Sequence, residues 1–316
     1  MKIVHVCGSE GVGQKLRIKI FTKSRVFLFC TTLPFVVILF LFAYLPLFGW
    51  SYAFVDYKPG IPILRQAWVG LKFFRQMFIP VNGFLSSLAD TLAMSALNLI
   101  VTPLPVIFAL MLAEVRNRKL SRLIQTISSI PNFISWILVY AISFAFFSND
   151  GILNTLLEGW GVISTPTNIL ANANAAWFYQ TANGIWKGIG WSAILYIAAL
   201  SGVDQELYEA AEIDGAGRFK KAIHISVPGL LPTYTVLLLL GISAILSNGF
   251  DQYYVFGNPM VIQKLQVIDV YVYNYGIGSM QYAYATAVGI FKSVISITLL
   301  FGANAAMKKT TGRSIT

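Results

Sequence analysis

The sequence predicts an all-α integral membrane protein with six transmembrane helices, and three observations lead to this prediction. Hydrophobic residues make up 56% of the 316 residues, charged residues make up 11%, and the mean hydropathy is +0.68. A soluble protein of this length needs more charge on its surface, so the composition favours a bilayer as the solvent. Apolar runs of spanning length recur along the whole chain, and the basic residues gather in clusters between them.

Six segments are long and apolar enough to cross the hydrocarbon core, which takes about 20 helical residues. They are residues 26–49, 88–112, 131–147, 181–200, 230–246 and 283–305. The polar and basic segment 1–25 is followed by a run of spanning length, which predicts an anchor rather than a cleavable signal. We therefore expect one membrane domain, residues 26–305, between an N-terminal segment and a tail, residues 306–316.

Positive charge predicts the direction of the spans, because lysine and arginine near span ends stay on the cytoplasmic side. Basic residues lie before the first span, after the second, after the fourth and in the tail, namely Lys15, Arg17, Arg116, Arg118, Lys119, Arg122, Arg218, Lys220, Lys221, Lys308 and Lys309. Residues 148–184 contain no lysine or arginine. We therefore expect cytoplasmic termini, a cytoplasmic loop at 201–232 and an external loop at 148–184.

The first external loop departs from this pattern, because it contains Lys58, Arg65, Lys72 and Arg75. Within residues 65–78, four large apolar residues recur at helical spacing, namely Trp68, Leu71, Phe74 and Phe78. This spacing predicts an interfacial helix that lies flat on the outer membrane surface. The alternative is that this helix lies inside and one span is misassigned.

The loop between the fourth and fifth spans has the residues of a short helix, a turn and a second short helix. Asp204 is a suitable N-cap, Ala210 and Ala211 favour a helix, and Asp214-Gly215 tolerates a tight turn. Small residues keep the turn free of bulk, and Pro228 suits the first turn of the following membrane helix. Such an elbow on the cytoplasmic face is suited to close docking of another protein.

This loop resembles the EAA motif of permeases of binding-protein-dependent ABC importers, with Val227 in place of the usual Leu and Ala222 in place of a common aromatic residue. Other stretches support the resemblance and point to the carbohydrate branch, namely residues 68–71, 130–136, 188–191 and 287–291. The resemblance implies the type I importer fold. It also implies an ATPase-coupling loop formed by Glu209, Ala210, Ala211, Asp214, Gly215, Ala216 and Pro228.

The resemblance implies several partners in the bacterial cytoplasmic membrane: a second homologous permease, two ATPase subunits, an extracytoplasmic solute-binding protein, lipid and an oligosaccharide substrate. ATP and Mg²⁺ would be used by the ATPases. The chain itself is expected to bind no cofactor and no nucleic acid, and to catalyse no reaction.

Sites for other chemistry are not expected. Residues 8–15 imitate a phosphate-binding loop, but Gln14 stands where its lysine is required. His5 and His224 have no ligands at metal-binding spacing, so no metal site is predicted. The alternative function is a gradient-driven transporter or channel, which usually needs carboxylates inside its spans. Because Asp90, Glu114, Asp204 and Asp251 all fall at span ends or in loops, the sequence disfavours it.

Five residues are candidates for the substrate path: Lys292, Asn98, Trp191, Asn248 and Tyr253. The aromatic side chains could stack on sugar rings or belong to the interfacial belt. Lys292 lies midway along the sixth span, where lysine facing lipid costs about 3 kcal/mol, and that span contains no carboxylate. We therefore expect an anionic, uronate-type sugar as its partner. The alternatives are a carboxylate of the partner permease or a snorkelling side chain.

Overall fold

The computed structural model describes residues 23–311 and divides into two units, one ending at Ser51 and one beginning at Tyr52. Residues 1–22 and 312–316, which belong to the predicted N-terminal segment and tail, lie outside the described part. Within residues 23–311 the regular structure is helical, apart from one isolated bridge between Val55 and Trp68. The prediction of an all-α membrane protein is confirmed.

The N-terminal unit is dominated by helix α1, Lys23–Leu39, which continues through a π turn at Phe40–Tyr44 into a 3-10 segment. Its described apolar side chains are exposed in all directions, as expected of a helix surrounded by hydrocarbon. The hydroxyl of Thr31 donates to the carbonyl of Phe27 at 2.7 Å, so this polar group is satisfied within the helix.

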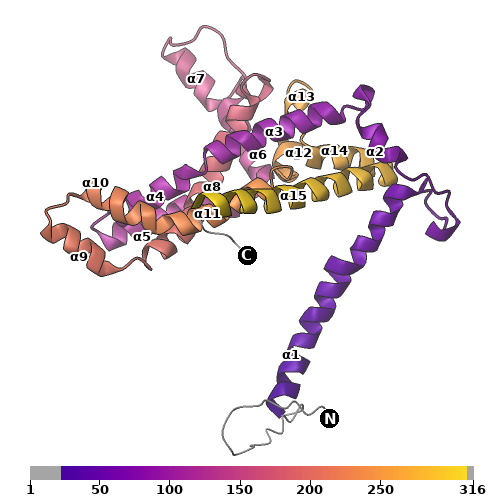
Figure 1. The fold of residues 1–316 in the computed structure, drawn as a ribbon. Helices are drawn as coiled ribbons and strands as arrows, with labels where there is room; N and C mark the ends of the chain where they lie inside the picture. Colours follow the sequence, from indigo (N-terminus) through magenta and orange to yellow (C-terminus); the bar gives the residue numbers. More distant parts are fainter. Residues whose placement is uncertain (1–22, 312–316) are drawn as a thin grey trace, which may run out of the picture. The chain divides into compact units, whose positions relative to one another are not determined.

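The larger unit is a bundle of helices from α2 to α15 (Figure 1). Their bounds are α2 Lys72–Met77, α3 Phe84–Ile100, α4 Pro103–Ala113, α5 Arg118–Ser129, α6 Trp136–Phe147, α7 Ile152–Gly159, α8 Ala176–Leu200, α9 Gln205–Ile213, α10 Arg218–Lys221, α11 Val227–Ser243, α12 Asp251–Phe256, α13 Ile262–Leu265, α14 Ile268–Tyr273 and α15 Tyr282–Thr311.

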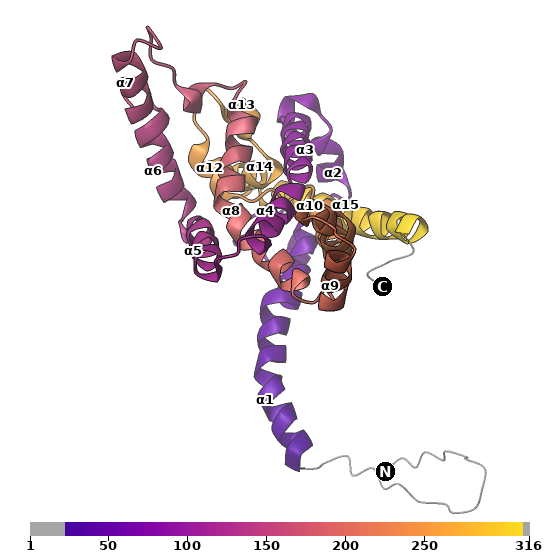
Figure 2. The ribbon, with the colours of Figure 1, turned by 90° about the vertical axis from the view of Figure 1, so that its left-hand side faces the viewer.

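Helix α8 is the central helix of this unit and packs against α4, α5 and α11. Helix α11 packs on α15, and α3 packs on α13 and α14. Helices α9 and α10 lie at one end of the unit, and α2 lies at the opposite end (Figures 1 and 2). The segment that resembles the EAA motif is therefore far from the short helices that follow α11.

The positions of the predicted spans agree with the structure, with shifted boundaries. Within residues 23–311, five helical segments are long and apolar enough to cross a membrane: Phe27–Phe54, Phe84–Ala113, Trp136–Gly159, Arg218–Ser243 and Tyr282–Lys309. The remaining predicted span, the fourth, is α8, which has 25 residues but lower hydropathy because it contains polar residues such as Gln180 and Lys187. These two side chains bond to neighbouring segments, which lowers the cost of placing them inside the bundle.

The predicted interfacial helix at 65–78 is wrong in its extent, because α2 includes only Lys72–Met77. Gly70 has a φ of +57°, a left-handed conformation that interrupts a right-handed helix. Residues on the two sides of Gly70 therefore share no helical face, and Trp68 is 72% exposed. Instead, Met77 is buried in the core, and α2 packs against α15.

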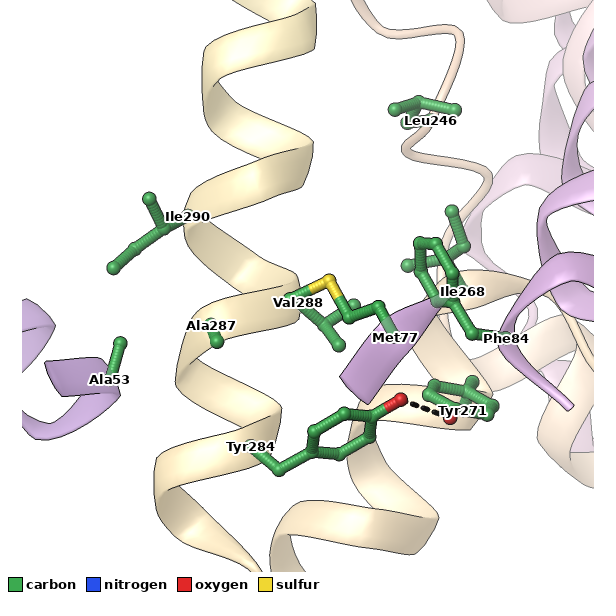
Figure 3. Close-up of a cluster of buried hydrophobic side chains, with 10 residues drawn as sticks. All are labelled: Ala53, Met77, Phe84, Leu246, Ile268, Tyr271, Tyr284, Ala287, Val288 and Ile290. Carbon is green, nitrogen blue, oxygen red and sulfur yellow. Dashed lines mark hydrogen bonds between the residues drawn. The ribbon is translucent and has the colours of Figure 1, made fainter. Parts of the chain in front are cut away.

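One buried cluster joins α2, α3, α14 and α15 around the start of α15 (Figure 3). Its polar centre is the hydrogen bond between the hydroxyls of Tyr271 and Tyr284, at 2.7 Å. The Tyr271 hydroxyl also lies 2.8 Å from the carbonyl oxygen of Asn82, so the short turn before α3 is tied to α14. This cluster fixes the frame on which residues 268–286 are held.

We expect thiol labelling to verify the topology. With Cys7 and Cys30 changed to serine, a cysteine at Asn174 should react with an impermeant reagent from outside, and a cysteine at Lys119 should not. Both positions are exposed in the structure, so accessibility within the protein is matched. Ser121 is a poorer internal site because its hydroxyl donates to the Leu112 carbonyl at 3.1 Å. The reverse labelling pattern would invert the predicted orientation.

Candidate functional site

The predicted elbow is present as α9, a turn and α10, and its first helix begins at a capped position. The carboxylate of Asp204 accepts a hydrogen bond from the backbone N–H of Glu206 at 3.0 Å. A carboxylate at this position also interacts favourably with the positive end of the helix dipole. The start of α9 is therefore fixed by local interactions alone.

Helix α9 ends in a Schellman turn centred on Gly215. The N–H of Ala216 donates to the carbonyl of Ala211 at 2.8 Å, and the N–H of Gly215 donates to that of Glu212 at 3.1 Å. Gly215 has a φ of +72°, which residues with a Cβ adopt only at a cost. Glycine is thus required by the backbone, in addition to any requirement of a docking partner.

Two large apolar side chains project from this elbow, and the sequence reasoning, which considered only its small residues, missed them. Ile213 is 88% exposed and Phe219 is 78% exposed, one on each side of the turn. Exposed apolar residues of this size in a polar loop are typical of a protein interface. The sequence signals them by placing two bulky apolar residues in a loop whose other residues are mostly small or charged.

The elbow is attached to the bundle by polar contacts of different strength. The hydroxyls of Tyr208 and Ser226 lie 2.9 Å apart, which ties α9 to the turn before α11. Arg218 and Glu114 form an ion pair at 3.8 Å between largely exposed side chains, so it contributes little stability. Movement of the elbow would therefore be transmitted to α11 chiefly through its backbone and the Tyr208 contact.

Pro228 lies in the first turn of α11, as predicted, but no break in the helix precedes it. Helix α10 continues through a π turn at Ala222–Ser226 into α11, so the helix already begins at Arg218. Proline lacks an N–H and clashes with the carbonyl four residues earlier in a regular α-helix. The wider π turn just before Pro228 lets the helix continue, because its hydrogen bonds join residues five apart.

Three of the five predicted path residues, Asn98, Asn248 and Tyr253, gather at α3, whereas Trp191 is on α8 and Lys292 is on α15. Tyr253 is buried beside Asn98, and burial raises the pKa of Tyr253 to about 12. Asn248 bonds to the Ser95 hydroxyl at 2.9 Å and to the Thr91 carbonyl at 2.8 Å, which joins the end of α11 to α3. Trp191 is half exposed and packs edge-on against Phe133. Whether any of them contacts substrate stays a prediction.

Lys292 has a partner that the sequence reasoning did not consider. Its amine forms an ion pair with Asp269 of α14, and both side chains are 20% exposed. The second oxygen of Asp269 accepts from the N–H of Gly249 at 3.1 Å. The premise that an anionic sugar supplies the missing partner is therefore wrong, and so is snorkelling. The pair was not predicted because Asp269 lies 23 residues away in the sequence, outside the predicted spans.

Two further polar side chains inside the bundle were also missed. Asp90 was placed at a span end, but α3 begins at Phe84 and Asp90 is only 6% exposed. Lys187 of α8 donates to the carbonyls of Pro131, Asn132 and Ile134 at 3.1, 2.7 and 2.5 Å. These carbonyls lie between α5 and α6, where helical bonding is interrupted, so Lys187 satisfies groups that would otherwise be costly in a membrane.

We expect the Asp269–Lys292 pair to be energetically coupled. Asp269→Asn and Lys292→Gln should each lower the unfolding temperature of the purified complex. The stability loss of the double variant should be smaller than the sum of the losses of the two single variants. The expected coupling is about 1–3 kcal/mol, because each single change leaves a poorly solvated charge without its partner.

The pair Glu212–Lys221, at 3.4 Å, provides the matched control, because Glu212 is 78% exposed. Its coupling should stay below about 1 kcal/mol. Equal coupling in the two pairs would contradict the structural role given to Asp269.

Comparison with known proteins identifies relatives over nearly the whole chain. Residues 102–311 match the family model described as "binding-protein-dependent transport system inner membrane component". The protein LplB of Bacillus subtilis is 41% identical over 291 residues, which cover 91% of this chain and 90% of LplB. The polygalacturonan/rhamnogalacturonan transport system permease protein YteP of the same organism is 38% identical over 300 residues, which cover 94% of this chain and 91% of YteP.

Solved structures support the same assignment. A chain of a bacterial ABC transporter involved in import of the acidic polysaccharide alginate superposes with a TM-score of 0.82, at 30% identity, over 92% of this chain and 97% of that one. A chain of a bacterial alginate ABC transporter in complex with an alginate pentasaccharide-bound periplasmic protein superposes with a TM-score of 0.83 at 29% identity. The superposition covers 93% of this chain and 98% of that one.

Proposed function

Because this chain belongs to the family of binding-protein-dependent transport system inner membrane components, we propose that it is the permease subunit of an ATP-driven importer that moves an oligosaccharide into the cell. Separate ATPase subunits would bind ATP and Mg²⁺ and perform the hydrolysis. A second homologous permease would complete the path, and an extracytoplasmic binding protein would deliver the substrate. The termini and the elbow would face the cytoplasm, in a bacterial inner membrane.

The elbow is the observation that carries this proposal. A Schellman turn fixes the direction of two short helices, and Ile213 and Phe219 extend from it as exposed apolar side chains. An ATPase surface with a matching cleft would cover them, and burial of each such side chain contributes roughly 1.5–3 kcal/mol. Closure of the ATPases would then push on α9 and α10. The continuous helix from Arg218 to Ser243 would transmit that movement into the bundle.

We propose an acidic oligosaccharide as the substrate. The proposal is supported by one relative named for polygalacturonan and rhamnogalacturonan transport and by two similar structures of alginate importers. It does not depend on Lys292, whose charge is balanced by Asp269. The external loop offers other cations, since Lys72 and Arg75 are exposed and line one hollow of about 730 Å³. Such cations would attract an anion by their field.

Reconstitution of the complete importer in vesicles tests this function. The complex would be supplied with its binding protein and with acidic or neutral oligosaccharides, including oligogalacturonides and maltotriose. We expect ATP-dependent uptake of the acidic oligosaccharides and stimulation of ATP hydrolysis by the loaded binding protein. Uptake driven by an ion gradient without ATP would instead favour a secondary transporter, for which the buried Asp90 would be the first residue to test.

A further inference from the structure

An open hollow of about 530 Å³ lies among α12, α14, the start of α15 and residues 52–57, within the larger unit. We call it the aromatic hollow, because its lining includes Tyr52, Tyr57, Phe250, Tyr273 and Tyr282. Its lining includes the start of α15, and this end of α15 is remote from α9 and α10 (Figure 1). Its volume is within the range of about 300–1,000 Å³ that is usual for small-molecule sites.

The aromatic residues form two sets of mutually supported rings. In one set, Phe250 and Tyr273 have ring centres 4.6 Å apart, and both contact Tyr254. In the other, Tyr57 lies 4.5 Å from Tyr52 and 5.9 Å from Tyr282. Rings that pack on one another lose little further freedom when a ligand binds, so the hollow presents preformed apolar faces.

The charged group of the lining is Asp269, and its charge is already compensated by Lys292. Lys292 bonds to one carboxylate oxygen and the N–H of Gly249 to the other, which fixes the orientation of the carboxylate. An ionised carboxylate has about four acceptor positions, so it can still accept a hydrogen from a hydroxyl group. The negative charge of Asp269 disfavours an anionic group of a ligand in the hollow. Because Lys292 already balances this charge, a ligand needs no cationic group there.

We propose that the aromatic hollow binds a pyranose ring of the transported oligosaccharide, with the C–H face of the ring on the aromatic side chains and a ring hydroxyl donating to Asp269. This inference rests on the proposed function and specifies where this chain touches the sugar. Apolar C–H faces next to hydroxyl groups are the chemistry that matches aromatic rings beside an ion-paired carboxylate. The carboxylates of an acidic saccharide would point away from Asp269.

The hydroxyl of Tyr273 provides a second polar contact for the sugar. Tyr273 lines the hollow, and its hydroxyl, which like any phenol is protonated at neutral pH, can exchange a hydrogen bond with a hydroxyl group of the sugar. A lipid chain would gain nothing from this hydroxyl or from Asp269. The combined lining therefore favours a sugar ring over a hydrocarbon chain.

The test uses the complete importer with trigalacturonate, its methyl ester and maltotriose. Tyr273→Ala and Tyr282→Ala each remove one ring, and each should raise the KM for a transported sugar by about two- to twelvefold. The factor should be the same for the acid and its methyl ester, because the ring face and not the carboxylate is bound. Tyr273→Phe keeps the ring and should return the KM to within about threefold of wild type.

Phe178→Ala on α8 is the control, because Phe178 is exposed and outside the hollow. Its KM should equal that of wild type. Wild-type KM values in both alanine variants would overturn the proposed subsite while leaving the transport function intact.

Saturation-transfer NMR of the detergent-solubilised complex measures binding without transport. We expect transfer to the ring protons of trigalacturonate, reduced in Tyr273→Ala. If the wild type transports none of the sugars but shows saturation transfer that depends on Tyr273, the proposed subsite is supported and the proposed import function is overturned. If neither transport nor transfer occurs with any sugar, both are overturned.

Discussion

Replacing Gly190 by alanine is expected to destabilise the protein by about 3 kcal/mol, the largest effect of any single methyl group that the structure predicts. A Cβ at this position in α8 would lie 2.3 Å from the backbone carbonyl carbon and oxygen of Ser128 in α5. Backbone atoms cannot rotate away as a flexible side chain can, so the two helices would have to separate. For a protein of this size, the unfolding temperature should fall by roughly 6–12 °C.

The same helix supplies the matched controls, because a Cβ at Gly184 or Gly188 would have nothing within 4 Å. Gly184→Ala and Gly188→Ala should leave the unfolding temperature unchanged or raise it slightly, since alanine favours a helix by about 1 kcal/mol over glycine. The measurement is thermal unfolding of the purified complex in one detergent. An unfolding temperature of Gly190→Ala equal to that of Gly188→Ala would show that α5 and α8 do not pack as described.

The contact of Gly190 with α5 lies one helical turn from a second interaction of α8. This second interaction holds α8 to the segment between α5 and α6. Lys187 donates to three backbone carbonyls of residues 131–134, while Gly190 lets α5 approach. Separation of α5 from α8 would also pull these carbonyls away from Lys187. Both losses act on the central helix, so the effect of Gly190→Ala should exceed that of a clash at the edge of the bundle.

Features set by neighbouring residues could be predicted from the sequence. The spans follow from apolar length, and the elbow follows from Asp204, from the alanines of α9 and from Gly215. In each case the residues that decide the structure lie within one continuous segment of the chain. The same local logic failed for residues 65–78, because the spacing of Trp68 and Phe78 was counted across Gly70, whose left-handed conformation interrupts the helix.

Features that join distant parts of the chain could not be predicted in this way. The partner of Lys292 is Asp269, and the aromatic hollow combines residues 52–57 with Phe250 and residues 269–286. No spacing rule relates these positions, because their proximity depends on how α12, α14 and α15 pack. Lys187 also lies inside a predicted span, where the cost of a charge facing lipid favours a polar partner. That partner proved to be backbone carbonyls.

The second large effect is expected on the coupling of ATP hydrolysis to transport rather than on folding. Gly215→Val should reduce transport by about tenfold or more, because a β-branched residue at a φ of +72° carries a strain of about 1–2 kcal/mol or more. A Cβ at Gly215 would have nothing within 4 Å in this chain, so the loss would come from the turn and from the docking partner. Relief of the strain would break the bonds from Gly215 and Ala216 to the end of α9.

Gly217→Val is the matched control for Gly215→Val, because Gly217 has a φ of −67°, which valine adopts readily, and its Cβ also has nothing within 4 Å. Both variants would be purified as complete importers and assayed for transport and for ATP hydrolysis stimulated by the loaded binding protein. We expect Gly215→Val to lose both activities and Gly217→Val to retain most of each. Because the two sites are two residues apart on the same exposed turn, equal loss in both variants would indicate bulk at the docking surface rather than backbone conformation. Wild-type activity in both would show that the elbow does not couple ATP hydrolysis to transport.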